Sequence, residues 1–185
     1  MTSAGRQLDA SSADAHAASI YGDLFAAVKD AGVTVAASLP DDWVYPLLPL
    51  FDEDPAISHV RVSREPEIIG ICSGAFFGGV RALGVMGATG FLACISEIVS
   101  LAIKQQIPVC LLVSLRGSIL DHQVFQEIQS RKVLAIVDAL GLRYLVLDRT
   151  EKLELIPHAL QQSRLQKRPY ILWLTKSLIT GAVPE

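Results

Sequence analysis

One carboxylate in the sequence stands between a strand-like segment and a helix, where chemistry is readily placed. Glu65 follows the run 57–62, which is rich in β-branched residues, and precedes Pro66, a residue tolerated in the first turn of a helix. Parallel sheets bind ligands beyond the carboxyl ends of their strands, so this carboxylate could act on a bound molecule. Alternatively, Glu65 only complements the helix dipole, which is worth about 0.3–1 kcal/mol. The residues alone leave both interpretations open.

A second group of polar residues follows a later apolar run, and we expect it to line the substrate side of a site: Ser114, Arg116, Gly117 and His122. The guanidinium of Arg116 could bind a carboxylate, sulfonate or phosphonate through two hydrogen bonds, or it could pair with Asp121. His122 could transfer protons, because imidazole titrates near neutral pH, or it could simply be hydrogen-bonded beside Asp121.

Short apolar runs alternate with helical patterns and must position these residues. The pattern predicts strands at residues 33–38, 57–62, 81–86, 109–114, 144–147 and 170–175. Helices are predicted before Gly32, at 43–51, 66–78 and 90–104, before Gly141, and at 151–166. This order predicts a single doubly wound α/β domain, with a mostly parallel sheet of about six strands and helices on both faces. The loops 39–42, 63–66, 87–90 and 114–122 then lie at its carboxyl edge.

The ends of the chain and its overall composition narrow the function classes. We expect residues 1–17 to be a mobile leader, 18–178 the domain and 179–185 a tail. With 51% hydrophobic residues and a net charge of -3, the chain offers no basic surface for nucleic acid or acidic lipid. Its apolar stretches are interrupted by charges and its N-terminus lacks a signal-like apolar segment, so we expect a cytoplasmic protein that does not enter a membrane. The cysteines are single, which indicates neither disulfides nor a metal site.

The segment around Glu65 resembles a known enzyme family. It carries the pattern Arg-Glu-x-Glu-x-x-Gly-Ile-x-x-Gly-Ala-aromatic, matched by Arg64, Glu65, Glu67, Gly70, Ile71, Gly74, Ala75 and Phe76. This pattern is similar to that of the pyrimidine-binding module of thiamine-diphosphate-dependent sulfopyruvate and phosphonopyruvate decarboxylases. Residues 35–40, 116–117 and 138–142 add further matches, and the resemblance extends over residues 22–173.

The resemblance implies a role for each residue that matches the module. Glu65 would hydrogen-bond N1′ of the cofactor's aminopyrimidine, favour its imino tautomer and so activate thiamine diphosphate to attack a small 2-keto acid. Glu65 would thus be the catalytic residue, and the cofactor would lie against Pro40, Asp41, Glu65, Gly87, Ala88, Thr89 and Gly90.

The resemblance also implies a partner chain. Related enzymes hold the diphosphate and Mg²⁺ through a Gly-Asp-Gly motif followed by an Asn, whereas this sequence contains no Asn and its single Gly-Asp, Gly22-Asp23, lies in a predicted helix. The chain would therefore be the α subunit of a hetero-oligomeric decarboxylase, and a separate β subunit would carry the diphosphate-binding module and Mg²⁺.

One loop departs from the family and supports two alternatives. Where these decarboxylases carry Gln-Asn-Ser-Gly-Leu-Gly-Asn, this chain has Gly-Ala-Thr-Gly-Phe-Leu-Ala at 87–93, without amide side chains. The loss of such hydrogen-bonding groups indicates a changed substrate or a module of the same fold without catalytic activity. The run 85–92 also resembles the dinucleotide-binding finger of short-chain dehydrogenases, but it would follow the third strand rather than the first, and Ala93 replaces a glycine of that finger.

Overall fold

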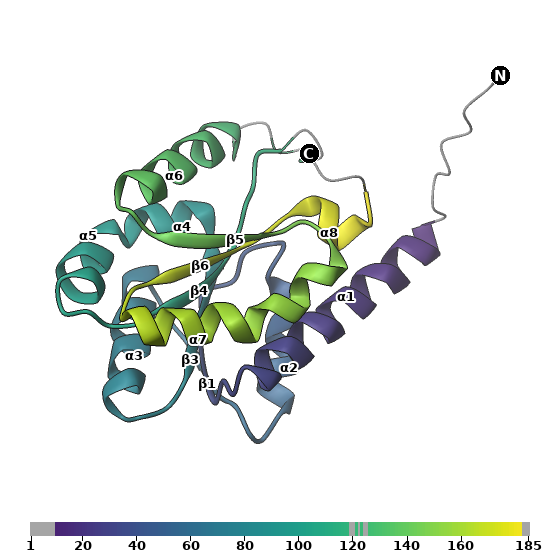
Figure 1. Ribbon diagram of the computed structural model, residues 1–185. Helices are drawn as coiled ribbons and strands as arrows, with labels where there is room; N and C mark the ends of the chain where they lie inside the picture. The colour runs from purple at the N-terminus through teal and green to yellow at the C-terminus, as the bar shows by residue number, and fades with distance from the viewer. Residues whose placement is uncertain (1–9, 119–120, 122, 124–125, 183–185) are drawn as a thin grey trace.

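A six-stranded, all-parallel sheet forms the centre of the protein (Figure 1). The computed structural model describes residues 10–118, 121, 123 and 126–182. The strand order is β2-β1-β3-β4-β6-β5, and each neighbouring pair is parallel. The strands are β1 (Val35–Ser38), β2 (Ser58–Arg61), β3 (Ala82–Gly87), β4 (Cys110–Ser114), β5 (Arg143–Leu147) and β6 (Tyr170–Leu174). The predicted α/β class and parallel sheet are therefore confirmed.

One face of the sheet is covered by helices from both ends of the chain. Leu83, Leu112 and Leu172 point to this face and are fully buried. They pack in one apolar core with the helices α1 (Ala10–Asp30), η1 (Tyr45–Leu47), α2 (Leu48–Glu53), η4 (Thr150–Leu155), α7 (Ile156–Gln166) and α8 (Lys176–Thr180). Proline in the first turns of η1, α2 and α7 suits helix starts, because its missing N–H would have no partner there.

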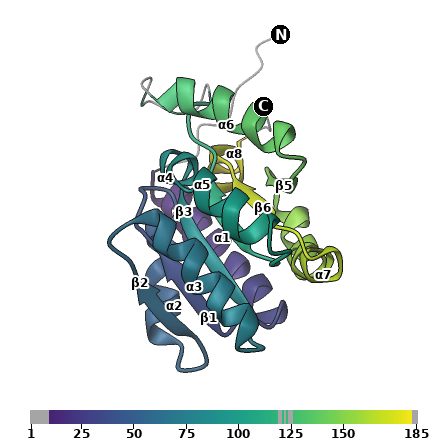
Figure 2. The same cartoon turned by 90° about the vertical axis from the view of Figure 1, so that its left-hand side faces the viewer.

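The opposite face carries the second layer, which includes the helix of Glu65. In Figure 2, α3 and α5 lie in front of the strands. Leu111, Val113 and Trp173 form the core beneath this layer. The layer comprises α3 (Glu65–Phe77), α4 (Ala88–Ala93), α5 (Ile95–Glu97), η2 (Ile98–Ile103) and α6 (Glu127–Ala139). Because Leu111 and Leu112 face opposite cores, both sides of β4 are buried, which explains its continuous apolar sequence.

Several helix boundaries differ from the sequence-based expectations. Helix α1 begins at Ala10, inside the expected leader, because the alanine-rich segment has high helix propensity. At the other end, Ile179 is buried in α8, so the expected tail begins within the packed domain. The predicted helix 90–104 is divided into α4, α5 and the π-helical η2. Within the described part of the chain, no helix has the length and apolar character of a membrane span.

Candidate functional site

The candidate residues meet where the connectivity of the sheet reverses. The chain runs from β1 outward to β2 and then returns to β3 on the other side of β1. The crevice beyond such a reversal is the usual ligand site of parallel α/β sheets. The loop after β1 carries Asp41, α3 opens with Glu65 directly after β2, and β3 ends at Gly87. The fold therefore brings the predicted cofactor-side residues to one edge of the sheet.

The carboxylate of Glu65 is not used to cap its own helix. Instead, Glu67 Oε2 accepts hydrogen bonds from the backbone N–H groups of Ser63, at 3.0 Å, and Arg64, at 3.4 Å. Glu65 itself is half-buried and forms no hydrogen bond or ion pair with a residue that the structure describes. Glu65 lies in the first turn of α3, where its charge can still complement the helix dipole, but no described partner occupies its carboxylate, which is available for a ligand.

Gly90 leaves room for the side chain of Glu65. A Cβ atom on Gly90 would lie 2.5 Å from both Cγ and Oε1 of Glu65, far inside ordinary contact distance. Gly90 is buried in α4, and the side chain of Glu65 passes directly over its backbone. Only glycine at position 90 allows this approach, so the altered loop 87–93 has kept the one feature that accommodates the candidate catalytic group.

Asp41 makes a similar approach to Gly87. A Cβ atom on Gly87 would lie 2.9 Å from Asp41 Oδ2. The other carboxylate oxygen, Oδ1, accepts a hydrogen bond of 3.0 Å from the backbone N–H of Trp43, which fixes the turn after Pro40. Pro40 itself is exposed. Thus the glycines at 87 and 90 receive the carboxyl side chains of Asp41 and Glu65.

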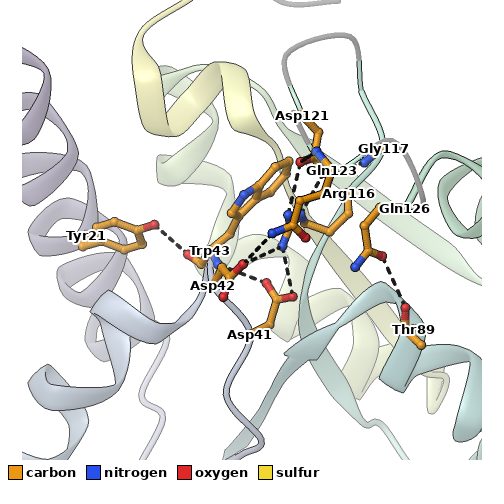
Figure 3. Close-up of polar contacts among 10 residues, drawn as sticks. All are labelled: Tyr21, Asp41, Asp42, Trp43, Thr89, Arg116, Gly117, Asp121, Gln123 and Gln126. Atoms are coloured by element: carbon orange, nitrogen blue, oxygen red, sulfur yellow. Dashed lines mark hydrogen bonds and ion pairs between the residues drawn. The ribbon is translucent and has the colours of Figure 1, made fainter.

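Arg116 lies at the centre of an acidic cluster (Figure 3). Its Nε and Nη2 atoms donate to Asp121 Oδ2 and Oδ1 at 2.8 and 3.1 Å, a bidentate pair. Its Nη1 lies 3.5 Å from Asp41 Oδ2 and 3.6 Å from Asp42 Oδ2. Only 3% of Arg116 is exposed. The alternative in which Arg116 pairs with Asp121 is therefore the one observed, and a substrate anion could reach the guanidinium only if a carboxylate gave way.

Asp121 is held firmly in its ionised state. Burial acts against ionisation, but hydrogen bonds from Arg116 and from the backbone N–H groups of Gly117 and Gln123 lower the pKa of Asp121 to about 2. Gly117 has a φ of +86°, and a Cβ atom there would lie 2.5 Å from the carbonyl oxygen of Gln126. Gly117 therefore shapes this loop.

The other predicted site residues occupy varied positions. Ala88 is fully buried, and the Thr89 hydroxyl lies 3.4 Å from Gln126 Oε1, to which it donates (Figure 3). Ser114 is the last residue of β4, and its buried hydroxyl has no partner among the described residues. His122 lies outside the described residues. Ala88 and Ser114 therefore contribute to the packed base of the site, whereas Thr89 is exposed.

Two aromatic residues beside the cluster, Trp43 and Tyr21, escaped the sequence analysis. The Cζ atom of Arg116 lies 4.5 Å from the centre of the Trp43 ring, a cation–π arrangement. The carbonyl of Trp43 accepts a 2.6 Å hydrogen bond from the hydroxyl of Tyr21. Burial, and secondarily the charge of Asp41, raise the pKa of Tyr21 to about 12, so it stays a donor at all ordinary pH values. The Asp-Asp-Trp run after Pro40 was the only signal in the sequence for this contact.

The dinucleotide-finger interpretation of 85–92 does not fit this geometry. Gly87 to Gly90 follow β3, which lies inside the sheet, and not the first strand of the chain. The space against Gly90 is filled by the carboxyl group of Glu65, whose charge would repel a pyrophosphate.

Comparisons with known proteins identify relatives of this chain, although no family model matches it. Over 118 residues it is 33% identical to the sulfopyruvate decarboxylase subunit alpha of Methanococcus maripaludis, covering 62% of this chain and 71% of the relative. The chain belongs to the sulfopyruvate decarboxylase alpha-subunit family. A family member in Methanothermobacter thermautotrophicus is 36% identical over 95 residues, which is 51% of this chain and 58% of that protein.

Other relatives of the family extend well beyond this chain. The sulfopyruvate decarboxylase of Methanosarcina acetivorans is 30% identical over 144 residues, which cover 78% of this chain but 37% of that protein. The chain thus spans well under two thirds of the length of some relatives. Among solved structures, 2-oxoglutarate:ferredoxin oxidoreductase from Magnetococcus marinus matches with a TM-score of 0.65 and 14% identity, covering 87% of this chain and 29% of that one. That match shows a shared fold.

Proposed function

We propose that this chain is the α subunit of a heteromeric, thiamine-diphosphate-dependent 2-keto-acid decarboxylase, in which Glu65 activates the cofactor. The observation that carries the proposal is the half-buried carboxylate of Glu65, which is unpaired among the described residues and lies over Gly90 at the reversal point of the sheet. Membership of the sulfopyruvate decarboxylase alpha-subunit family supports it.

The residues present fit an aminopyrimidine better than a phosphate. A ring nitrogen that shares a proton with a carboxylate suits Glu65, and the missing side chains at positions 87 and 90 leave room for the carboxyl groups of Asp41 and Glu65 at this edge of the sheet. When bound, thiamine diphosphate supplies the electron sink that decarboxylation of a 2-keto acid requires. Glu65 would hold the proton at N1′, Gly90 would keep Glu65 in place, and the buried Ala88 and Phe91 would help exclude water.

A partner β subunit would complete the site. Relatives in the family are named subunit alpha, which implies a second kind of subunit in those proteins. In this chain, no group of three acidic, histidine or cysteine side chains in the described ranges is arranged to hold a metal ion. We therefore propose that Mg²⁺ and the diphosphate are bound by the β subunit, and that a small 2-keto acid reacts between the two chains.

The arrangement around Arg116 suggests a role for it in this complex. Because its charge is already matched by Asp121, Asp41 and Asp42, Arg116 would mainly connect the loop after β1 with the loop after β4. A direct contact of Ser114, Arg116, Gly117 or His122 with the substrate remains a proposal, and for Arg116 it requires that Asp121 be displaced.

The decisive experiment replaces Glu65 in the complex reconstituted with the β subunit, thiamine diphosphate and Mg²⁺. Glu65→Gln keeps the shape of the side chain but removes its ability to hold the proton, so kcat should fall by about 100-fold or more. Glu67→Gln is the matched control on the same helix, because an amide oxygen can still accept the capping hydrogen bonds, and its kcat should stay within about twofold. Near-normal turnover of Glu65→Gln would refute the proposed role.

The second candidate function is a non-catalytic module of the same fold. It is favoured by the loop 87–93, in which Ala88 is fully buried and no amide side chain faces a ligand. This candidate predicts that the reconstituted wild-type complex is inactive on any 2-keto acid while the two subunits still associate.

A further inference from the structure

The carboxyl ends of β4, β5 and β6 enclose a pocket separate from the Glu65 site. Its volume is about 230 Å³, below the roughly 300–1,000 Å³ of pockets for drug-sized ligands, so it suits a small molecule. It shares no lining residue with the loop 87–90 or with Glu65, and it is lined by Leu115, Ser118, Val146, Asp148, Thr175, Lys176 and Ser177.

Lys176 supplies a positive charge at this pocket. Its ammonium group lies 5.4 Å from the centre of the Trp43 ring and pairs with no carboxylate in the part of the chain that the structure describes. The other cation near Trp43, Arg116, already has its acidic partners. Lys176 is therefore the cation of this region whose charge is available to a bound anion.

The hydroxyl groups of the pocket have defined hydrogen-bonding roles. Thr175 Oγ1 donates its single proton to the carbonyl of Leu147, at 2.8 Å. The 2.9 Å contact between Thr175 Oγ1 and Ser177 Oγ must then use the proton of Ser177, which leaves Ser177 only lone pairs to offer. The Oγ atom of Ser118 is inaccessible to solvent and has no partner among the described residues, so it can still donate and accept.

Asp148 adds a negatively charged group to the lining of the pocket. Although burial opposes its ionisation, hydrogen bonds from Arg149 and Lys152 lower the pKa of Asp148, so it remains a carboxylate. A carboxylate repels an anion and attracts a hydrogen-bond donor. The pocket thus presents donors at Lys176 and Ser118, and acceptors at Asp148 and Ser177.

We propose that this pocket binds a small organic acid whose carboxylate or sulfonate group pairs with Lys176 and Ser118, and whose hydroxyl or amino group donates to Asp148 and Ser177. This second site shares no residue with the proposed cofactor-binding set, although Leu115 and Ser118 come from the loop that follows β4 and also carries Arg116.

The test uses the full chain and three probes of graded chemistry. Isethionate carries both a sulfonate and a hydroxyl group, ethanesulfonate lacks the hydroxyl, and ethylene glycol lacks the acid. Titrations followed by amide NMR shifts should show saturable binding of isethionate, with Kd about 1–10 mM and the largest shifts at Ser118 and Ser177. Ethanesulfonate should bind several-fold more weakly, and ethylene glycol should give no saturable shift.

Variants decide whether Lys176 is the counter-ion. Lys176→Gln should weaken isethionate binding at least about fivefold, whereas Lys104→Gln, an exposed lysine that pairs with no described carboxylate, should leave it unchanged at matched ionic strength. The proposal is overturned if isethionate does not saturate below about 50 mM, or if both lysine variants behave alike. Equal affinity for ethanesulfonate would overturn the assignment of Asp148 and Ser177.

Discussion

Replacing Gly90 by alanine should strongly reduce the activity of the complex while changing the stability of the chain only slightly. The added Cβ would lie 2.5 Å from Glu65 Cγ and Oε1 and 2.7 Å from Cδ, whereas ordinary contacts lie near 3.5–4.0 Å. The Glu65 side chain must therefore move by about 1 Å, and a displacement of that size at a reacting group can reduce the rate about 100-fold.

The free energy of unfolding should change much less in Gly90→Ala. Glu65 is half-buried and bears no structural hydrogen bond to a described residue, so it can rotate away. Alanine also favours the helical conformation of α4 by about 1 kcal/mol relative to glycine, which offsets part of the crowding. We expect the stability to stay within about 1 kcal/mol of the wild type.

Two assays and one control variant make this prediction decisive. The kcat of the reconstituted complex reports on Glu65, and thermal unfolding of the chain by circular dichroism reports on stability. Gly22→Ala is the control, since a Cβ at this exposed position of α1 meets nothing within 4 Å, and it should leave kcat unchanged. A folded Gly90→Ala complex with kcat within threefold of the wild type, about 0.7 kcal/mol, would refute the reasoning.

Two further predictions concern stability. Gly84→Ala would bring a Cβ to 2.5 Å from Ile68 Cγ2 and 2.6 Å from Leu111 Cδ2 in the packed core. The variant should therefore lower the free energy of unfolding, measured by urea titration, by about 1–3 kcal/mol. An unchanged urea midpoint would contradict this prediction. The pKa of Asp121 is lowered to about 2, so above the ordinary pKa of aspartate, near 3.9, its carboxylate adds about 2 kcal/mol to the free energy of unfolding. This contribution is lost as the pH falls from about 4 to 2. Asp121→Asn should therefore have a lower free energy of unfolding than the wild type at pH 7, and this free energy should fall less between about pH 4 and 2. An acid-unfolding profile like that of the wild type would show that the pair with Arg116 contributes nothing to stability.

The inner strands could be predicted from sequence because they are short apolar runs with clear boundaries. The run predicted at 109–114 is observed as Cys110–Ser114, and the run predicted at 81–86 as Ala82–Gly87. Both faces of such strands are buried, so the pattern depends little on tertiary detail. The ends of helices are harder to predict. The apolar pattern of residues 90–104 indicates a helix, but nothing in it indicates the change to π-helical hydrogen bonding in η2.

The candidate site could be predicted in part. Glu65 was identified from its place between strand and helix, but its approach to Gly90 joins residues from different βα units and has no local signal. Likewise, the sequence allowed Arg116 to meet either a ligand or Asp121. The structure adds Asp41 and Asp42 to that cluster, and Asp41 lies 75 residues away along the chain. Such choices depend on the packing of the loops, which sequence spacing does not report.

Native mass spectrometry of the protein isolated from its own source with Mg²⁺ tests the central claim most directly, because it detects a partner chain and a bound cofactor together. The account predicts a hetero-oligomer in which this chain is accompanied by a second, different subunit and by the added mass of thiamine diphosphate. A homo-oligomer or monomer that carries no such cofactor would contradict it.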